Sequence, residues 1–173
     1  MKFIVLFFPL LFIAGCKKET PLLFEMPFQN LDFTMPAGQN ALETYYVNFP
    51  AVPTNITALL DNFKIEANEV SGIVPGNGRL FPIFGAGDFD DLFREFVVQI
   101  CPTGSTDNKC GFEGFYWDLV GQKIGLELNL IPNPLDLSDL LMEDKVHIQV
   151  WYRLLRASNE TIDTRLALSF LVQ

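Results

Sequence analysis

The stretch Arg165-Leu-Ala-Leu-Ser-Phe-Leu-Val172, close to the end of the chain, decides the fold class. Its apolar residues fall at every second position: Leu166, Leu168, Phe170 and Val172. A strand places residues at that spacing on one face, whereas a helix would scatter them around its axis. Residues 146–155 alternate in the same way, and the mostly polar residues 156–164 separate the two segments. That connector is longer than a tight hairpin needs, so the two strands either pair directly or face each other across a core.

The chain after residue 30 contains further short apolar segments, separated by turn-forming Pro, Gly, Asn and Asp. The other expected strands cover residues 31–35, 42–49, 63–69, 73–74, 80–84, 96–101 and 124–130. Residues 75–78, Pro-Gly-Asn-Gly, suit positive φ and predict a turn. The candidates for short helices are 88–96, with Asp88 as its cap, then 136–142, and after these 54–60. We therefore predict an all-β fold, an antiparallel β-sandwich of about eight short strands with one or two short helices.

The composition is that of a folded, acidic domain. The 173 residues carry a net charge of −9, and 49% of them are hydrophobic while only 19% are charged. A chain with so few charged residues is unlike a disordered protein. Its negative charge is repelled by nucleic-acid phosphates and by anionic lipid headgroups. The sequence therefore argues against DNA, RNA or an electrostatically bound membrane surface as a partner.

The first residues have the pattern of an export signal. Lys2 is followed by an apolar run over residues 3–14, interrupted only by Pro9. A helix of that length spans about 18 Å, well short of the hydrocarbon core of a bilayer. The run therefore indicates the core of a signal peptide rather than a spanning helix. It ends in Ile13-Ala14-Gly15-Cys16, which resembles the lipobox of bacterial lipoproteins.

The resemblance implies a lipid anchor on Cys16. In that family the cysteine receives a diacylglycerol thioether, becomes the new N-terminus after cleavage and usually takes a further acyl chain. Two or three chains hold a protein on a membrane essentially permanently. Lys17 stands where an aspartate would signal retention in the inner membrane, so the outer membrane is favoured, on either its periplasmic or its surface face. The alternative is a core cysteine in a buried N-terminal helix.

Three regions follow from these patterns. Residues 1–15 are the predicted lipoprotein signal peptide. Residues 16–30 are the predicted lipidated tether, because they contain Pro21 and Pro27 and show no convincing period. Residues 31–173 are the predicted β-sandwich domain.

Two further cysteines, Cys101 and Cys110, enclose loop-forming residues 102–109. In an exported protein such a pair predicts a disulfide. Closing a ring of this size stabilises a domain by about 2.7 kcal/mol on the chain-entropy model. A metal site is the alternative, but it would need further ligands close to the two cysteines, and His147 lies far from them in the sequence. No metal is therefore predicted there.

The aromatic segment 111–118 holds the candidate ligand-binding residues, Phe115, Tyr116 and Trp117. In an exposed loop these rings would stack on sugars or contact a protein. The alternative is that Phe112, Phe115 and Trp117 fill the core. A row of Tyr116, Trp117 and Trp151 on the surface would favour carbohydrate binding, and complete burial would remove that hypothesis.

Other candidate chemistry is weak. Asp88, Asp90 and Asp91 offer oxygens for calcium, but their spacing does not fit an EF-hand loop, and a capped helix explains them. No Gly-x-Ser-x-Gly elbow is present, and the alternation around His147 places this histidine on an outer face, exposed or half-buried. We predict no catalytic residues, no metal and no cofactor.

The function predicted from these patterns is that of an outer-membrane-anchored lipoprotein. It would act as a non-enzymatic protein-interaction module of the bacterial cell envelope and dock on another envelope protein. The alternative is a lipoprotein that binds carbohydrate or another small ligand. In both cases the membrane is contacted through lipid on Cys16, and nucleic acid is not a partner.

Overall fold

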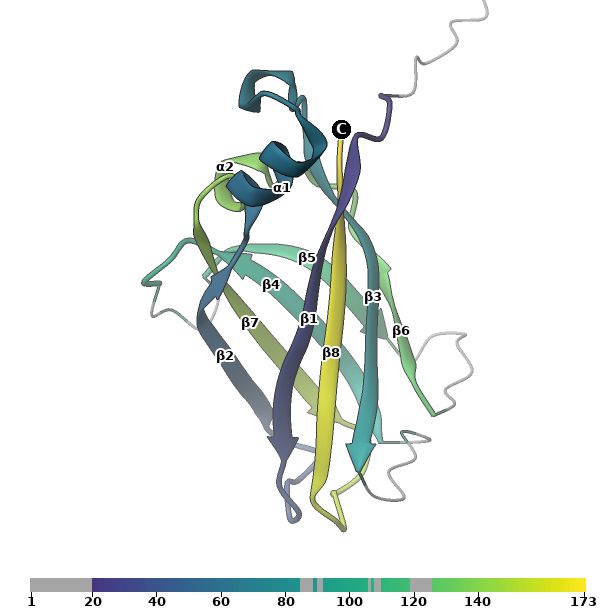
Figure 1. The fold of residues 1–173 in the computed structure, drawn as a ribbon. Helices are drawn as coiled ribbons and strands as arrows, with labels where there is room; N and C mark the ends of the chain where they lie inside the picture. Colours follow the sequence, from purple (N-terminus) through teal and green to yellow (C-terminus); the bar gives the residue numbers. More distant parts are fainter. Residues whose placement is uncertain (1–19, 85–88, 90–91, 106, 108–109, 119–125) are drawn as a thin grey trace, which may run out of the picture.

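The computed structural model describes residues 20–84, 89, 92–105, 107, 110–118 and 126–173. It contains eight strands: β1 (Phe24–Met35), β2 (Thr44–Pro53), β3 (Ile73–Phe84), β4 (Phe93–Cys101), β5 (Phe112–Asp118), β6 (Leu128–Pro132), β7 (Lys145–Leu154) and β8 (Ile162–Val172). Two short helices, α1 (Ile56–Phe63) and α2 (Ser138–Leu141), lie together at one end of the sheet (Figure 1). No helix in this part of the chain is long and apolar enough to cross a membrane.

The strands form one antiparallel sheet in the order β1-β8-β3-β6-β5-β4-β7-β2. The sheet curves strongly, so that β1, β8 and β3 lie in front of β4, β5 and β7 with the core between them (Figure 1). The predicted all-β, antiparallel fold with about eight strands and two short helices is confirmed. Its two facing layers are halves of a single continuous sheet, joined where β5 pairs with β6.

The two strands that decided the fold class lie in opposite halves of the sheet. β7 pairs with β2 and β4, whereas β8 pairs with β1 and β3. Of the two arrangements left open by the sequence, the strands therefore adopt the one in which they face each other across the core. Phe170 of β8 is fully buried and packs edge-on against Phe115 of β5, with ring centroids 5.5 Å apart.

The folded part begins earlier than predicted. The expected tether extended through Asn30, but β1 begins at Phe24 and pairs with β8 along most of its length. Phe24, Met26 and Phe28 alternate with exposed residues and are buried. Pro27 is compatible with this strand because β1 lies at the edge of the sheet, where a missing amide hydrogen costs little. A bulge between Phe28 and Leu31, where Asn30 adopts a φ of 67°, interrupts the alternation of apolar and polar residues along β1. The strand pattern was therefore hidden in the sequence.

The predicted strand at 63–69 is wrong. Helix α1 ends at Phe63, Lys64 closes it in a left-handed conformation, and Ala67–Glu69 form a 3-10 turn. Glu66 and Glu69 make reciprocal side-chain hydrogen bonds to the backbone of this turn, which favours a helical start over a strand. The helices predicted at 54–60 and 136–142 correspond to α1 and α2.

The turn predicted at 75–78 is also absent, because β3 runs through these residues without reversing. Gly76 and Gly78 serve close packing rather than positive φ. A Cβ atom on Gly78 would lie 2.9 Å from Cδ1 of Phe115, and one on Gly76 would lie 3.0 Å from Cγ of Leu171.

The helix predicted at 88–96 is contradicted from Phe93 onward, where β4 begins, while Asp88 and residues 90–91 lie outside the described part. Phe93 and Phe96 share a face as they would on a helix, and both are fully buried. A bulge between Phe93 and Glu95 turns both rings to the core side of a strand instead. β6 occupies residues 128–132, displaced from the predicted 124–130.

Candidate functional site

The outer face of β2, β7, β4 and β5 carries a row of large side chains. The strand register places Tyr46 opposite Trp151, Trp151 opposite Val97, and Val97 opposite Tyr116. We name Tyr46, Trp151 and Tyr116 the aromatic row, in which Val97 lies between Trp151 and Tyr116. Neighbouring strands lie about 4.8 Å apart, so the row extends over about 14 Å. Tyr46 is 38% exposed, Trp151 and Tyr116 are half-buried, and Val97 is covered.

A groove of about 340 Å³ lies beside the β2 end of the aromatic row, lined by Thr44, Tyr46, Glu95, Trp151 and Arg153. Arg153 donates to Glu95 through Nε, at 2.9 Å from Oε2, and through Nη2. The ion pair fixes the orientation of both side chains. The groove therefore combines flat aromatic surface with polar groups held at its rim.

The carboxyl group of Glu113, on the same face, has a pKa that its surroundings shift. Glu113 of β5 pairs with Gln99 of β4. Partial burial, and then the negative charge of Glu95, raise the pKa of Glu113 above its ordinary value.

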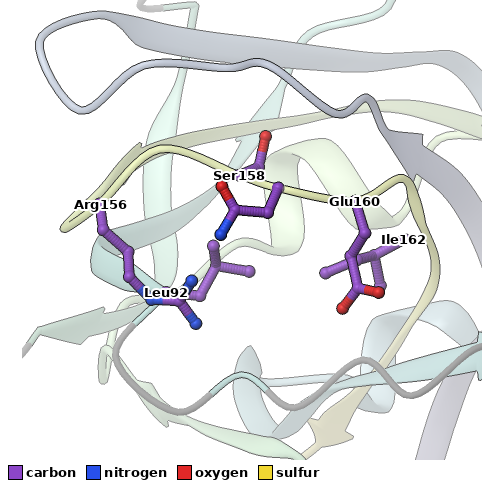
Figure 2. Close-up of a pocket in the computed structure, with 6 residues that line it drawn as sticks. Leu92, Arg156, Ser158, Glu160 and Ile162 are labelled. Atoms are coloured by element: carbon purple, nitrogen blue, oxygen red, sulfur yellow. The ribbon is translucent and has the colours of Figure 1, made fainter.

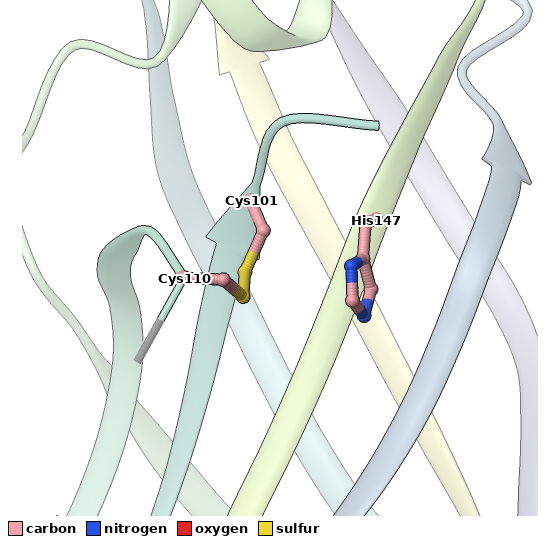
Figure 3. Close-up of side chains that lie close together, drawn as sticks. All are labelled: Cys101, Cys110 and His147. Carbon is pink, nitrogen blue, oxygen red and sulfur yellow. A yellow bond between two sulfur atoms is a disulfide. The ribbon is translucent and has the colours of Figure 1, made fainter. Parts of the chain in front are cut away.

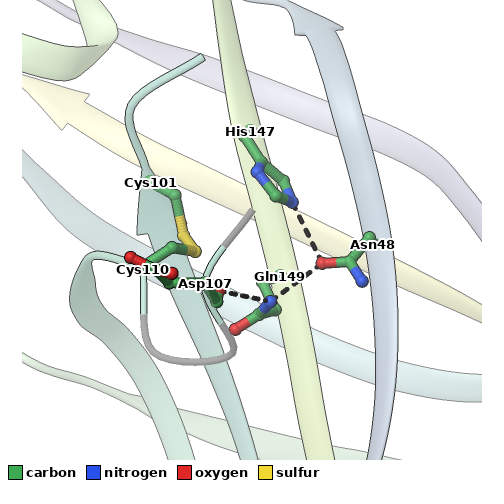
Figure 4. The surroundings of a disulfide bond; sticks show 6 residues. All are labelled: Asn48, Cys101, Asp107, Cys110, His147 and Gln149. Carbon is green, nitrogen blue, oxygen red and sulfur yellow. Dashed lines mark hydrogen bonds between the residues drawn. A yellow bond between two sulfur atoms is a disulfide. The ribbon is translucent and has the colours of Figure 1, made fainter. Parts of the chain in front are cut away.

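On the opposite side of the row from Arg153, polar side chains and the disulfide form a cluster in which Asn48 is exposed, Cys110 is half-buried and the other members are buried. Its members, which we name the His147 cluster, are Asn48, Gln99, Cys101, Cys110, His147 and Gln149. The loop that follows β4 covers it, and Asp107 of that loop accepts a hydrogen bond through its carbonyl oxygen from Nε2 of Gln149, at 3.3 Å (Figure 4). His147 is only 3% exposed, so the prediction of an exposed or half-buried histidine is wrong.

The disulfide predicted between Cys101 and Cys110 is present, with the two Cα atoms 5.3 Å apart. Cys101 ends β4 directly opposite His147 of β7, and the imidazole lies beside the sulfur atoms (Figure 3). A ring nitrogen of His147 and the two Sγ atoms lie within 4.8 Å of one another. The distance in sequence between His147 and the cysteines concealed this arrangement, because it depends on the pairing of β4 with β7.

The predicted ligand-binding residues separate into two groups. Phe115 and Trp117 are 0% and 1% exposed and belong to the core, so placing them in a binding surface was wrong. Tyr116 points the other way and joins the aromatic row. Tyr46 and Trp151 complete the row, although the sequence analysis had not connected Tyr46 with any site. Phe112, at the start of β5, is 57% exposed and lies outside the row.

A second depression, also of about 340 Å³, lies where the segment after β7 passes Leu92. Arg156 and Leu92 lie on one side of it, and Glu160 and Ile162 lie on the other (Figure 2). The predicted lipidation site Cys16 and the acidic residues Asp88, Asp90 and Asp91 lie outside the described part of the chain.

Comparison of the chain with protein-family models, with curated proteins and with solved structures finds no match.

Proposed function

We propose that this chain is a lipid-anchored, non-enzymatic binding protein of the bacterial cell envelope, and that the aromatic row binds its ligand. The lipobox-like Ile13-Ala14-Gly15-Cys16 supports the anchor. The observation that carries the binding function is the alignment of Tyr46, Trp151 and Tyr116 on one outer face.

Carbohydrate is the ligand class that this face suits best. A sugar ring has an apolar face edged by hydroxyl groups, and Tyr and Trp offer a flat apolar surface with one polar group. A row of about 14 Å corresponds to a few linked sugar rings. Glu95 and Arg153 on one flank supply acceptors and donors for hydroxyl groups close to the rings.

Binding of soluble oligosaccharides, measured by calorimetry over a range of sugars and chain lengths, tests this proposal. Affinity should rise from one sugar unit to three, because longer chains contact more of the row. Trp151→Ala should weaken binding at least tenfold, since the truncation removes the central ring. Phe112→Ala is the matched control, an exposed aromatic residue outside the row, and should bind as the parent does. Equal loss in both variants, or no oligosaccharide bound, would contradict carbohydrate binding.

A second candidate is docking on another envelope protein. Tyr, Trp and Arg dominate the energetics of protein interfaces, and the groove contains Tyr46, Trp151 and Arg153. A photo-crosslinking amino acid placed at position 46 in living cells would then give one discrete protein adduct. The same group at the exposed Phe63, on α1, would not give that adduct.

A further inference from the structure

We propose that Cys101, Cys110 and His147 form a zinc-binding site when the disulfide is reduced. The two cysteines would then form a structural disulfide when oxidised and bind a metal ion together with His147 when reduced. It is separate from the aromatic row and does not depend on the proposed binding function.

The hydrogen bonds of the His147 cluster fix which ring nitrogen is free. The carbonyl oxygen of Asp107 can only accept, so the atom of Gln149 that faces it is the amide nitrogen. The same nitrogen donates to Oδ1 of Asn48 at 2.9 Å, which requires Asn48 to present its oxygen. Nε2 of His147 lies 3.1 Å from that oxygen and must therefore carry a proton (Figure 4).

It follows that Nδ1 of His147 carries a lone pair and no proton. This atom is buried and has no hydrogen-bond partner among the described residues. It lies on the side of the ring that faces Cys101 and Cys110 (Figure 4). A buried, unprotonated imidazole nitrogen directed at two sulfur atoms is the arrangement of a metal ligand. Asn48 would play the part of the outer partner that orients a ligating histidine.

The distances suit a tetrahedral ion. Bond lengths of about 2.3 Å to sulfur and about 2.1 Å to nitrogen place the ligand atoms about 3.6–3.8 Å from one another. The three ligand atoms already lie within 4.8 Å of each other. Cys101 and His147 are held on neighbouring strands in direct register, while Cys110 lies outside the strands, between β4 and β5, and its sulfur would have to move away from that of Cys101 to bind one ion. A water molecule would supply the fourth ligand of a tetrahedral ion.

The ligand set selects the kind of ion. Two thiolates and an imidazole favour zinc or copper(I) over calcium and magnesium, which prefer oxygen. The cluster also holds two buried acceptors, Oε1 of Gln99 and Oε1 of Gln149, without a hydrogen-bond partner among the described residues. Cys101 is fully buried and Cys110 is half-buried, so a reductant and an ion would approach from the side of Cys110.

The chemistry balances with a dithiol as reductant. The dithiol gives two electrons and two protons to the disulfide, which becomes two thiols, while the dithiol itself closes to a disulfide. Zinc then displaces both thiol protons to solvent and accepts the lone pair of His147 Nδ1. Two thiolates neutralise the charge of the ion, and the oxidised protein has no thiolate to offer.

The test uses the full-length chain with Cys16→Ala in detergent, so that Cys101 and Cys110 are its only cysteines. The protein is reduced with a phosphine and titrated with Co²⁺, which reports thiolate ligation by charge-transfer absorption near the ultraviolet, and the ion is then displaced with Zn²⁺. We expect one ion per reduced chain and none per oxidised chain. His147→Gln should weaken binding at least tenfold, and Asn48→Ala should weaken it between tenfold and a hundredfold.

The variant with Cys101→Ser and Cys110→Ser controls for adventitious binding and should show no charge-transfer band. The proposal is overturned if the reduced parent shows no such band, or if His147→Gln binds as tightly as the parent. Should reduction unfold the chain, zinc must restore its β-sheet circular dichroism in the parent and not in His147→Gln. Failure of that restoration also overturns the proposal.

Discussion

Gly78 lies in β3 directly opposite Leu130 of β6, beneath the ring of Phe115. A Cβ atom there would lie 2.9 Å from Cδ1 of Phe115 and 3.1 Å from Cβ of Leu130. Phe115 cannot withdraw easily, because its ring packs edge-on against Phe170. Close contact between facing parts of the sheet therefore requires glycine at this position.

We expect Gly78→Ala to lower the free energy of unfolding by about 1–3 kcal/mol, the usual cost of overfilling a packed interior. Gly72→Ala is the matched control, since the nearest atom to its Cβ would be Oδ1 of Asp136 at an ordinary 3.7 Å. Urea unfolding of both variants gives the comparison. Equal stability of the two variants would contradict close packing as the reason for Gly78.

Single residues also show what the sequence conceals. Alternation correctly placed His147 on the outer face of its strand, but an outer face is exposed only where no other segment covers it. The loop after β4 covers this one, and the hydrogen bond between Gln149 and Asp107 holds the loop in place. Likewise the glycines at 76 and 78 suggested a turn, although their role is defined by atoms from distant strands.

At the scale of elements, strands with a strict period of two were predictable. β7 and β8 appear where the alternation placed them, and β8 begins three residues earlier, at Ile162. Two of the failures fall where a bulge breaks the period, whereas the one at 63–69 falls where Glu66 and Glu69 favour a helical turn. The bulge in β1 made its first residues resemble a tether, and the bulge in β4 made Phe93 and Phe96 resemble a helix face.

The junction between α2 and β3 depends on one carboxylate. Oδ1 of Asp136 accepts hydrogen bonds from the hydroxyl of Ser138, from the amide of Ile73 at 3.1 Å and from the amide of Ser138 at 3.0 Å. The Ser138 hydroxyl is the main cause that holds the pKa of Asp136 below its ordinary value, and the two amides add to it against partial burial. The charged carboxylate thus stabilises the fold.

We expect Asp136→Asn to lower the free energy of unfolding at pH 7 by about 1 kcal/mol, a value reduced for solvent exposure. Because the folded pKa is lowered, the contribution is present above the unfolded pKa, near 3.9, and is lost as the pH falls through the folded pKa. The difference in free energy of unfolding between the parent and the variant should therefore narrow between pH 5 and pH 2. Urea unfolding, repeated at intervals of about one pH unit, measures this difference.

Asp139→Asn, an exposed carboxylate of the same helix, is the control for that titration. It should change stability little at pH 7. A gap between the parent and Asp136→Asn that stays constant down to pH 2 would show that the carboxylate charge plays no part.

At the scale of the whole molecule, the order of the strands in the sheet could not be predicted from the sequence. The aromatic row joins residues from β2, β7 and β5, and the His147 cluster joins β2, β4, β7 and the covering loop. Each residue's face follows from alternation, but which strands are neighbours depends on the packing of the complete core. Both sites therefore became visible only when the topology was known.

The early start of β1 shortens the link to the proposed anchor. Only residues 17–23 separate Cys16 from Phe24, and a flexible coil of that length would reach about 15 Å. β1 begins at the end of the molecule that also carries α1, α2 and the C-terminus (Figure 1). An anchor on Cys16 would hold that end towards the membrane, with the aromatic row facing sideways along the flank of the sheet.

The proposed anchor depends on one sulfur atom, that of Cys16. A thioether to diacylglycerol can form only at Cys16, and each buried methylene of the acyl chains contributes about 0.8 kcal/mol to membrane binding. We expect the parent to incorporate labelled fatty acid in cells and to enter the detergent phase, and Cys16→Ala to lose the label. The variant with Cys101→Ser and Cys110→Ser keeps Cys16 and should still be labelled, which separates loss of lipidation from loss of a thiol. Label that persists in Cys16→Ala would mean that the chain is lipidated elsewhere, and the lipobox assignment would be wrong.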